Sequence, residues 1–323
     1  MRIALPPLIA PAAFAGLDPA MPVVELGGET MGTRWRVLAA MPRERAPVVE
    51  AAVIALLDGL VAEMSHWRAG SLLCRFNRAN PDSWHPLPPA FAEVMATGLR
   101  VAAASGGAFD PAIGGLVDLW GFGPVTAELP PDDRELTAAR ACSGWHRLRF
   151  DLAGRRLWQP GGVALDLSGI AKGFAVDAIA DLLAREGVAH ALVEVGGELV
   201  GRGIRPDGDP WWVDLENPPG CTLPPLRVAL HGLAVATSGD YRRGDHSIDP
   251  RTGRPCANGV ASVSVLHARA MDADAWASAL TVAGLEEGSM MAAREGLAAR
   301  IVVRRAGEWI ERLSPALKAM LAD

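Results

Sequence analysis

The order of the elements predicted along these 323 residues favours an α+β fold with mostly antiparallel sheets and flanking helices. Several predicted strands follow one another without an intervening helix, whereas parallel strands need a long crossover connection. Half of the residues are hydrophobic and 21% are charged, a composition that can bury a substantial core in one large domain or two joined lobes. These observations disfavour a doubly wound parallel sheet and exclude general disorder.

In the first half of the chain, apolar spacing predicts a strand, two helices and a hairpin. The strand should follow a turn at Gly27-Gly28, and the second helix should end at Gly106-Gly107, because glycine commonly ends helices. A segment rich in proline and acidic residues, 124–133, is the predicted boundary or excursion between lobes. The predicted ranges are 29–39 for the strand, 46–64 and 89–104 for the helices, and 146–158 for the hairpin, which turns at 151–154.

The second half of the chain is predicted to contain mainly strands, with two helices among them. One helix should follow a glycine-rich loop and stop at Gly187, and the other should start at Asp272, whose carboxylate is interpreted as its cap. The predicted helices are 174–185 and 272–283, the loop is 168–173, and the strands are 163–167, 191–195, 211–216, 226–230, 261–266 and 300–304.

Charge and composition exclude several classes of function. The net charge is −6 with no run of like charges, so a polyanion such as DNA would be repelled and nucleic-acid binding is not expected. Four scattered cysteines without a CxxC pair fit neither a disulfide framework nor a cysteine zinc site, and they are interpreted as free thiols. No segment approaches the roughly 18 uninterrupted apolar residues that a transmembrane span requires.

Residues 1–22 are predicted to be an extension that precedes a single domain of residues 23–323. They contain a basic start and a short apolar run, and Ala13-Phe14-Ala15 resembles a signal-peptide cleavage site. Three prolines interrupt that run, and no cysteine suitable for lipidation follows it. A soluble cytoplasmic protein is therefore favoured, and a periplasmic location is the alternative.

The densest motif is DLSGIAKG at residues 166–173, which places a carboxylate, two glycines and a lysine just before a predicted helix. Backbone N–H groups at the helix start and the lysine ammonium would both face a phosphate there. Lys172 is one of two lysines among 31 basic residues, which suggests a need for a compact point charge. An ordinary strand-to-helix turn, in which Asp166 makes turn hydrogen bonds, explains these residues equally well.

Asp274 and Ser278 are four residues apart in a predicted helix and therefore lie on one face. A carboxylate and a hydroxyl suit Mg²⁺, which prefers oxygen ligands and completes its octahedron with water and substrate phosphates. Helix capping also explains an acidic residue in a first turn, so both interpretations stay open for Asp274.

His246 follows the polar segment 237–241 and could transfer a proton near pH 7. A solitary loop histidine is more often a surface or supporting residue. Phe109-Asp110-Pro111 and Trp120 could form an aromatic wall of a site, although such aromatic residues more often belong to the core.

In their order and spacing, these segments resemble the ApbE family, the FAD:protein FMN transferases, over nearly the whole chain. The sequence departs from the family pattern in three ways: Ser278 replaces a common threonine, Cys74 replaces a common serine, and the lipidation cysteine near the N-terminus is missing. The matching segments are Met31-Gly32-Thr33, residues 65–68 with Ser71 and 75–77, 107–111 through 119–121, 166–177, 196–197, 212–218, 237–239, 246–250 and 273–280.

The resemblance implies a two-lobed fold with FAD in the cleft between the lobes. It also implies a magnesium ion held by the Asp274 carboxylate, the Ser278 side chain and the backbone carbonyl of Gly169. The positions that match FAD contacts are Met31, Trp67, Ala108, Phe109, Asp110, Asp166, Lys172 and Ile248, with Met31 and Trp67 as apolar contacts and Lys172 close to phosphate.

The implied reaction is a Mg²⁺-dependent transfer of the FMN part of FAD to a Ser or Thr hydroxyl of a target flavoprotein, with release of AMP. The target would be a flavin subunit of a redox complex with a Ser/Thr-Gly-Ala-Ser/Thr-like segment. His246 is the hypothesised proton acceptor and Asp110 is the alternative. Two rival functions would use the same residues: an FAD pyrophosphatase that uses water, and an FAD-binding protein without turnover.

Overall fold

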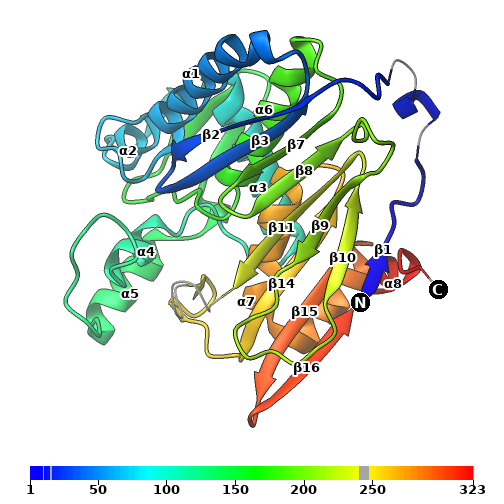
Figure 1. Ribbon diagram of the computed structural model, residues 1–323. Coiled ribbons are helices and arrows are strands. Elements are labelled where there is room, and N and C mark those ends of the chain that lie inside the picture. Colours follow the sequence, from blue (N-terminus) through cyan, green and yellow to red (C-terminus); the bar gives the residue numbers. More distant parts are fainter. Residues whose placement is uncertain (10, 15–16, 240–246, 323) are drawn as a thin grey trace.

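The centre of the molecule is an eight-stranded sheet in which every neighbouring pair of strands is antiparallel (Figure 1). The computed structural model describes residues 1–9, 11–14, 17–239 and 247–322. The sheet has the order β16-β15-β14-β11-β8-β7-β3-β2. Its strands are β2 (Val23–Thr30), β3 (Thr33–Ala40), β7 (Ala191–Val195), β8 (Glu198–Arg202), β11 (Leu233–Gly239), β14 (Val260–His267), β15 (Ala298–Arg305) and β16 (Glu308–Leu313). The predicted α+β class with mostly antiparallel sheets is confirmed.

Helices cover one face of this sheet and a small second sheet covers the other. α6 (Ala171–Arg185) and α7 (Ala270–Arg294) pack on the strands. α1 (Ala46–Met64) packs against α6 and β2, and α3 (Pro89–Ala104) packs against α7. The alternation of side chains along β11 separates two cores, because Ala234 and Ala236 face the helices while Val235 faces the small sheet. That sheet consists of β1 (Arg2–Ala4), β10 (Leu226–Leu230) and β9 (Trp211–Leu215).

Helices α1 and α3 confirm the ranges predicted from apolar spacing. Both begin with proline in the first turn, and the buried face of α1 consists of Val49, Val53, Leu57, Leu60 and Met64 at helical spacing. Strands β7 and β10 also confirm their predicted bounds, and β9, β14 and β15 differ from the prediction by a few residues at most. The predicted hairpin is present as β5 (Arg149–Asp151) and β6 (Arg156–Gln159), which β4 (Ser83–Pro86) extends.

The predicted turn at Gly27-Gly28 is wrong, because both glycines lie inside β2. The chain turns instead at Met31-Gly32, where φ is positive at both residues (49° and 70°), as a two-residue hairpin of right-handed twist requires. Gly28 is needed in the strand because a Cβ there would lie 2.8 Å from Nε1 of Trp35 on β3. Glycine here allows the indole to pack against the backbone.

The predicted strand 163–167 is also wrong, because this mostly buried segment belongs to no strand and joins no sheet among the described residues. Asn77 binds both backbone groups of Leu165 with its side-chain amide, at 2.8 and 3.0 Å. Pro111 accepts the N–H of Asp166 at 3.0 Å. The segment therefore satisfies its polar backbone without a ladder, so its apolar character alone could not identify it as a strand.

Helix α7 differs from the prediction at both ends. It runs eleven residues beyond position 283 and contains a non-helical residue, Gly284 (φ 80°), where Asn258 donates to the carbonyls of Thr281 and Val282. Asp272 is not its cap, because its carboxylate pairs with Arg100. The N–H groups of the first two helical residues are instead bound by the buried carboxylate of Asp177 on α6, at 3.0 Å each.

The segment predicted as a boundary or excursion lies between α4 (Gly114–Leu119) and α5 (Asp133–Cys142), which project together from the body of the molecule (Figure 1). A capping box between Asp132 and Glu135 starts α5.

The N-terminal residues are joined to the body of the molecule. Strand β1 pairs with β10, and the side chain of Arg2 forms an ion pair with Glu311 on β16. No helix among the described residues is long and apolar enough to cross a membrane. The remaining short elements among the described residues are the helices α2 (Leu72–Asn77) and α8 (Pro315–Ala319), the strands β12 (Ile248–Asp249) and β13 (Arg254–Pro255), and three 3-10 helices at Pro11–Phe14, Arg43–Arg45 and Trp145–Arg147.

Candidate active site

The DLSGIAKG motif leads into α6, and its backbone packs directly against the start of α7. Helix α6 begins at Ala171, three residues earlier than predicted, so Lys172 and Gly173 belong to its first turn. The N–H of Gly173 donates to Oδ2 of Asp274 at 2.9 Å. A Cβ on Gly173 would lie 2.3 Å from the carbonyl oxygen of Ala270, so only glycine permits this approach of the two helices.

Gly169 and Ser278 are in contact at this junction, and Asp274 lies one helical turn before Ser278 on α7. A Cβ on Gly169 would lie 2.7 Å from Oγ of Ser278, so the loop backbone touches the serine hydroxyl. Ser238 on β11 also approaches that hydroxyl, with 3.5 Å between the two Oγ atoms. Asp274 is 3% exposed and therefore presents its carboxylate in a nearly water-free setting.

Glu198 is a member of this cluster that the sequence did not predict. It lies on β8, is 2% exposed, and its Oε1 is 2.5 Å from Nζ of Lys172. Its Oε2 is buried and has no hydrogen-bond partner among the described residues. The only sequence signal is the preceding Gly196-Gly197 turn, in which a Cβ on Gly196 would lie 3.3 Å from Cδ of Lys172.

The cluster carries more negative than positive charge in a buried place. Burial raises the pKa of Glu198 to about 7, with Lys172 acting against this rise and the charge of Asp274 adding to it. Burial also raises the pKa of Asp274, against the opposing effects of Lys172 and the Gly173 N–H. Two buried carboxylates beside one ammonium would be stabilised by a further cation, which would lower both pKa values.

A second buried charge cluster joins the predicted Asp166 to two residues that were not predicted, His66 and Asp118. His66 lies between two carboxylates, with Nδ1 2.9 Å from Oδ2 of Asp166 and Nε2 3.3 Å from Oδ2 of Asp118 on α4. Burial lowers the pKa of His66, but the hydrogen bonds and charges of Asp118 and Asp166 outweigh it and raise that pKa to about 10. Despite burial, His66 and Ser168 hold the pKa of Asp166 below its usual value.

Asp110 is held by backbone groups. Its Oδ1 accepts the N–H of Ala112 at 2.8 Å and its Oδ2 accepts the N–H of Trp145 at 2.9 Å. Burial outweighs these bonds and raises the pKa of Asp110 to about 6. Its neighbours Ala108 and Phe109 are buried, and Phe109 approaches Gly169, since a Cβ on that glycine would lie 3.4 Å from Cε2 of the ring.

The other predicted FAD contacts differ in exposure. Met31 is in the β2–β3 turn and is partly buried against the main core. Trp67 is 66% exposed although it directly follows the buried His66. Ile248 on β12 is buried in a small cluster with Leu116 and Leu136 of the α4–α5 excursion. His246 lies outside the described residues.

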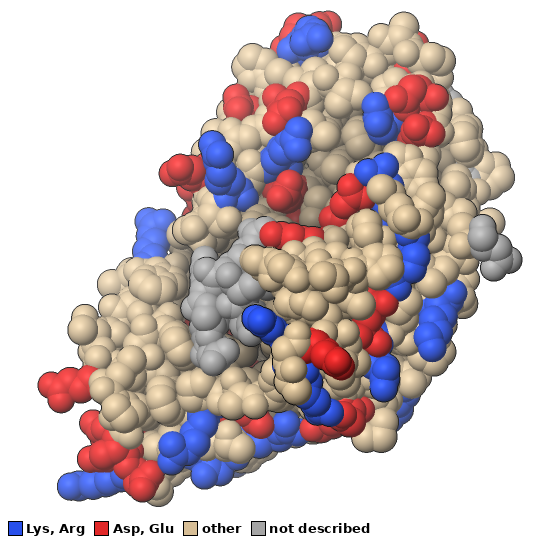
Figure 2. All heavy atoms as spheres, turned by 60° about the horizontal axis from the view of Figure 1, so that its bottom comes forward, with Lys and Arg blue, Asp and Glu red and all other residues tan. Residues whose placement is uncertain are grey.

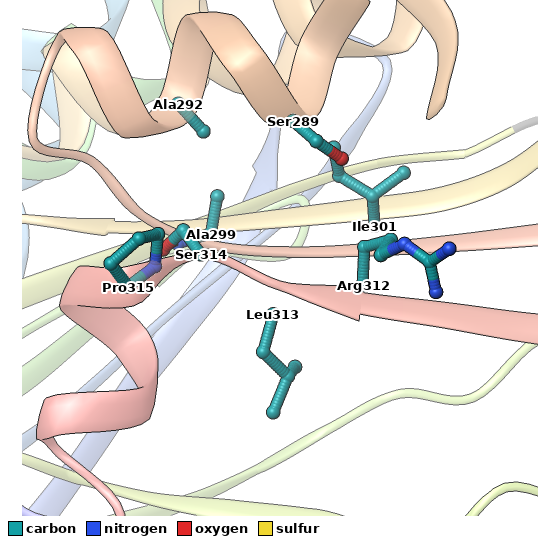
Figure 3. Close-up of a pocket in the computed structure, with 8 residues that line it drawn as sticks. All are labelled: Ser289, Ala292, Ala299, Ile301, Arg312, Leu313, Ser314 and Pro315. Atoms are coloured by element: carbon teal, nitrogen blue, oxygen red, sulfur yellow. The ribbon is translucent and has the colours of Figure 1, made fainter. Parts of the chain in front are cut away.

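Two cavities lie along α7, and neither contains the predicted cluster. The cavity in Figure 3, about 110 Å³, lies between the second half of α7 and β15–β16, and its lining is mostly apolar and includes Ala292, Ile301 and Leu313. A cavity of about 250 Å³ is bordered by Thr281, which lies one turn beyond Ser278, and by Ser247, Cys256 and Asn258.

Figure 2 shows acidic and basic side chains interspersed on one face of the molecule, without a patch of a single sign there.

The antiparallel sheet and the loop between two adjoining helix starts define an α+β protein with a buried cluster of a lysine, two carboxylates and a serine hydroxyl. The chain belongs to the ApbE family, whose model matches residues 31–301. It is 34% identical to the FAD:protein FMN transferase of Klebsiella pneumoniae, over 96% of this chain and 93% of that one. The FAD:protein FMN transferase of Escherichia coli K12 is 33% identical, over 100% of this chain and 97% of its own.

Solved structures give the same assignment. The flavinyl transferase ApbE of Pseudomonas stutzeri, in its apo form, superposes with a TM-score of 0.87 at 35% identity, covering 93% of this chain and 97% of that one. The flavin transferase ApbE of Vibrio cholerae has a TM-score of 0.87 at 33% identity, with 93% of this chain and 99% of that one covered. The family resemblance seen in the sequence is confirmed.

Proposed function

We propose that this protein transfers the FMN part of FAD to a Ser or Thr hydroxyl of an acceptor protein, with Mg²⁺ bound and AMP released. The relatives named FAD:protein FMN transferase support flavin transfer. The observation that carries the site assignment is the contact between the Gly169 backbone and the Ser278 hydroxyl beside the buried Asp274 carboxylate. This junction brings together a carbonyl-bearing loop, a hydroxyl and a carboxylate.

The residues at the junction fit a magnesium ion. Mg²⁺ takes oxygen ligands and keeps several positions for water and phosphate oxygens, so one carboxylate suffices. Among the described residues no group of three or more His, Cys, Asp or Glu side chains is arranged to hold a metal, which disfavours a cage of charged ligands. We assign the carboxylate of Asp274, the hydroxyl of Ser278 and the backbone carbonyl of Gly169 as ligands. The bound ion would supply charge compensation for the diphosphate of FAD.

The chain's own residues would orient FAD around this ion. The ammonium of Lys172 and the positive end of the α6 helix dipole favour the diphosphate. The exposed indole of Trp67 and the side chain of Met31 offer apolar surface to the flavin. Ala108, Phe109, Asp110, Asp166 and Ile248 complete the proposed FAD set, and of these Asp166 acts through the loop, since its carboxylate is already bound by His66 and Ser168.

Transfer requires that the acceptor hydroxyl lose its proton as its oxygen attacks the FMN phosphorus and the bond to AMP breaks. We assign the proton to His246 and keep Asp110 as the alternative. Both oxygens of Asp110 already accept backbone N–H groups, which supports His246. The acceptor would be a redox-complex flavin subunit with a Ser/Thr-Gly-Ala-Ser/Thr-like segment.

Mass spectrometry of a candidate acceptor after incubation with the enzyme, FAD and Mg²⁺ tests this function. Transfer predicts an acceptor heavier by one FMN phosphoester and an equal amount of AMP. The matched control is the same acceptor with the segment's Ser or Thr replaced by Ala, which should stay unmodified. Free FMN with an unmodified acceptor would identify a hydrolase, and unchanged FAD would indicate binding without turnover.

A further inference from the structure

His66 connects three parts of the chain that are distant in sequence. Its ring contacts Asp166, 100 residues away, at the entrance to the Gly169 loop, and Asp118, 52 residues away, on the projecting helix α4. Its side chain is only 7% exposed. Because carboxylates face both ring nitrogens, both nitrogens donate, and the ring is an imidazolium shared by two anions.

Hydrogen bonds also hold the backbone around His66. Oγ of Ser65 accepts the N–H groups of Trp67 and Arg68 at 3.1 and 3.2 Å. The carbonyl of Ser65 accepts the hydroxyl of Ser71 at 2.7 Å, and the carbonyl of His66 accepts the thiol of Cys74 at 3.2 Å. Because both the backbone and the ring of His66 are held, the position of the backbone of the next residue, the exposed Trp67, is set as well.

Asp166, which accepts a hydrogen bond from the His66 ring, also hydrogen-bonds the start of the Gly169 loop. Its Oδ1 accepts the N–H of Ser168 at 2.9 Å, and its Oδ2 accepts the hydroxyl of Ser168 at 3.1 Å in addition to the imidazolium. These bonds form the turn that leads into Gly169, whose backbone touches Ser278. A change at His66 therefore reaches the Gly169 carbonyl through Asp166 and Ser168.

We propose that His66 is a positioning residue that, by donating from both ring nitrogens, holds the Gly169 loop, the Trp67 segment and helix α4 in one arrangement. The expected effect on turnover rests on the proposed function. The contacts of His66 with Asp166 and Asp118, which we call the His66 clamp, exist without any ligand. His66 touches no metal ligand and acts on the ion only through the loop.

The variant His66→Gln removes the charge and one of the two donors. Loss of a residue that orients a metal ligand typically costs about 10–100-fold in metal affinity or activity, so the Mg²⁺ concentration for half-maximal turnover should rise by about that factor. Asp166→Asn should give a similar rise, and the double variant should be no worse than either single variant, because the two side chains act as one unit. His85→Gln is the matched control. Among the described residues, the His85 ring hydrogen-bonds Ser83 and packs against the ring of Phe76, so this variant should leave the Mg²⁺ dependence unchanged.

Two measurements on the full chain without ligands separate failure of the clamp from failure of the proposed function. NMR titration of the histidine rings should show one ring, absent in His66→Gln, that stays protonated through pH 8. Thermal unfolding should show that Asp166→Asn added to His66→Gln restores part of the lost stability, because it neutralises a stranded buried carboxylate. A His66 ring that titrates near pH 6.5, additive effects of the two substitutions, or an unchanged Mg²⁺ dependence in folded His66→Gln would each overturn the proposal.

Discussion

Gly169→Ala tests the proposed metal site by adding a single methyl group. Gly169 is not among the residues with positive φ, so alanine meets no backbone penalty there. The new Cβ would lie 2.7 Å from Oγ and 3.3 Å from Cβ of Ser278, and 3.4 Å from Cε2 of Phe109. The first of these distances is shorter than real contacts allow, so Ser278 must move. Overpacking of this kind costs about 1–3 kcal/mol of unfolding free energy.

The same displacement should disable the cation site, because the serine hydroxyl and the loop carbonyl can no longer converge. We expect turnover at a fixed, limiting Mg²⁺ concentration to fall at least about tenfold, which corresponds to about 1.4 kcal/mol. The assay is a Mg²⁺ titration of AMP release beside urea unfolding of the same preparation. Ser278→Ala combined with Gly169→Ala should recover most of the stability and none of the Mg²⁺ response.

Gly59→Ala provides the control for the added methyl group. Gly59 is in the interior of α1 with nothing within 4 Å of the new Cβ, so alanine should stabilise the helix by about 0.5–1 kcal/mol and leave turnover unchanged. Gly169→Ala with a wild-type Mg²⁺ titration would refute the placement of the ion between the loop and Ser278.

Four further outcomes follow from the site. Asp274→Ala should abolish Mg²⁺-dependent turnover in metal-buffered assays, because it removes the only charged ligand assigned to the ion; near-normal turnover would show that the ion binds elsewhere. Lys172→Arg should slow AMP release although the charge is kept, since a guanidinium is too bulky for the narrow space between Glu198 and Gly196; equal rates would make the lysine incidental. His246→Gln should slow single-turnover transfer by about 10²–10⁴-fold with little change in FAD affinity measured by flavin fluorescence; the reverse pattern would move His246 to FAD binding. The stability advantage of the wild type over His66→Gln should be present in full below pH 6.5 and disappear as the pH rises to about 10, because folding raises the pKa of His66 between these values; urea unfolding at several pH values measures it, and a constant difference would contradict the assigned ion pairs.

Local signals predicted the helices α1 and α3 and the strands β7 and β10 with their correct ends. Proline at the start of α1 and α3 and glycine after α3 act within one turn of the chain, and the 3.6-residue spacing of apolar residues records which face is buried. The same local rules failed at Gly27-Gly28. A glycine pair that begins a turn and a glycine pair that admits Trp35 from the next strand look alike in one dimension.

The sequence named the residues of the proposed site but did not name the residues that contact them. Asp166, Gly169, Lys172, Asp274 and Ser278 stand in two short motifs whose residue types already suit phosphate and Mg²⁺. Glu198 and His66 lie outside such motifs. Their importance depends on burial and on charges brought from other elements.

The sequence by itself therefore determined the fold class and the family, because periodicity, turn residues and motif order are properties of neighbouring positions. Only the tertiary structure decided which oxygens converge, that Asp177 rather than Asp272 caps α7, and that His66 lies between Asp118 and Asp166. The physical reason is that a buried charge is tolerated only where folding supplies its counter-charge, and the identity of that partner depends on packing between segments as much as 100 residues apart.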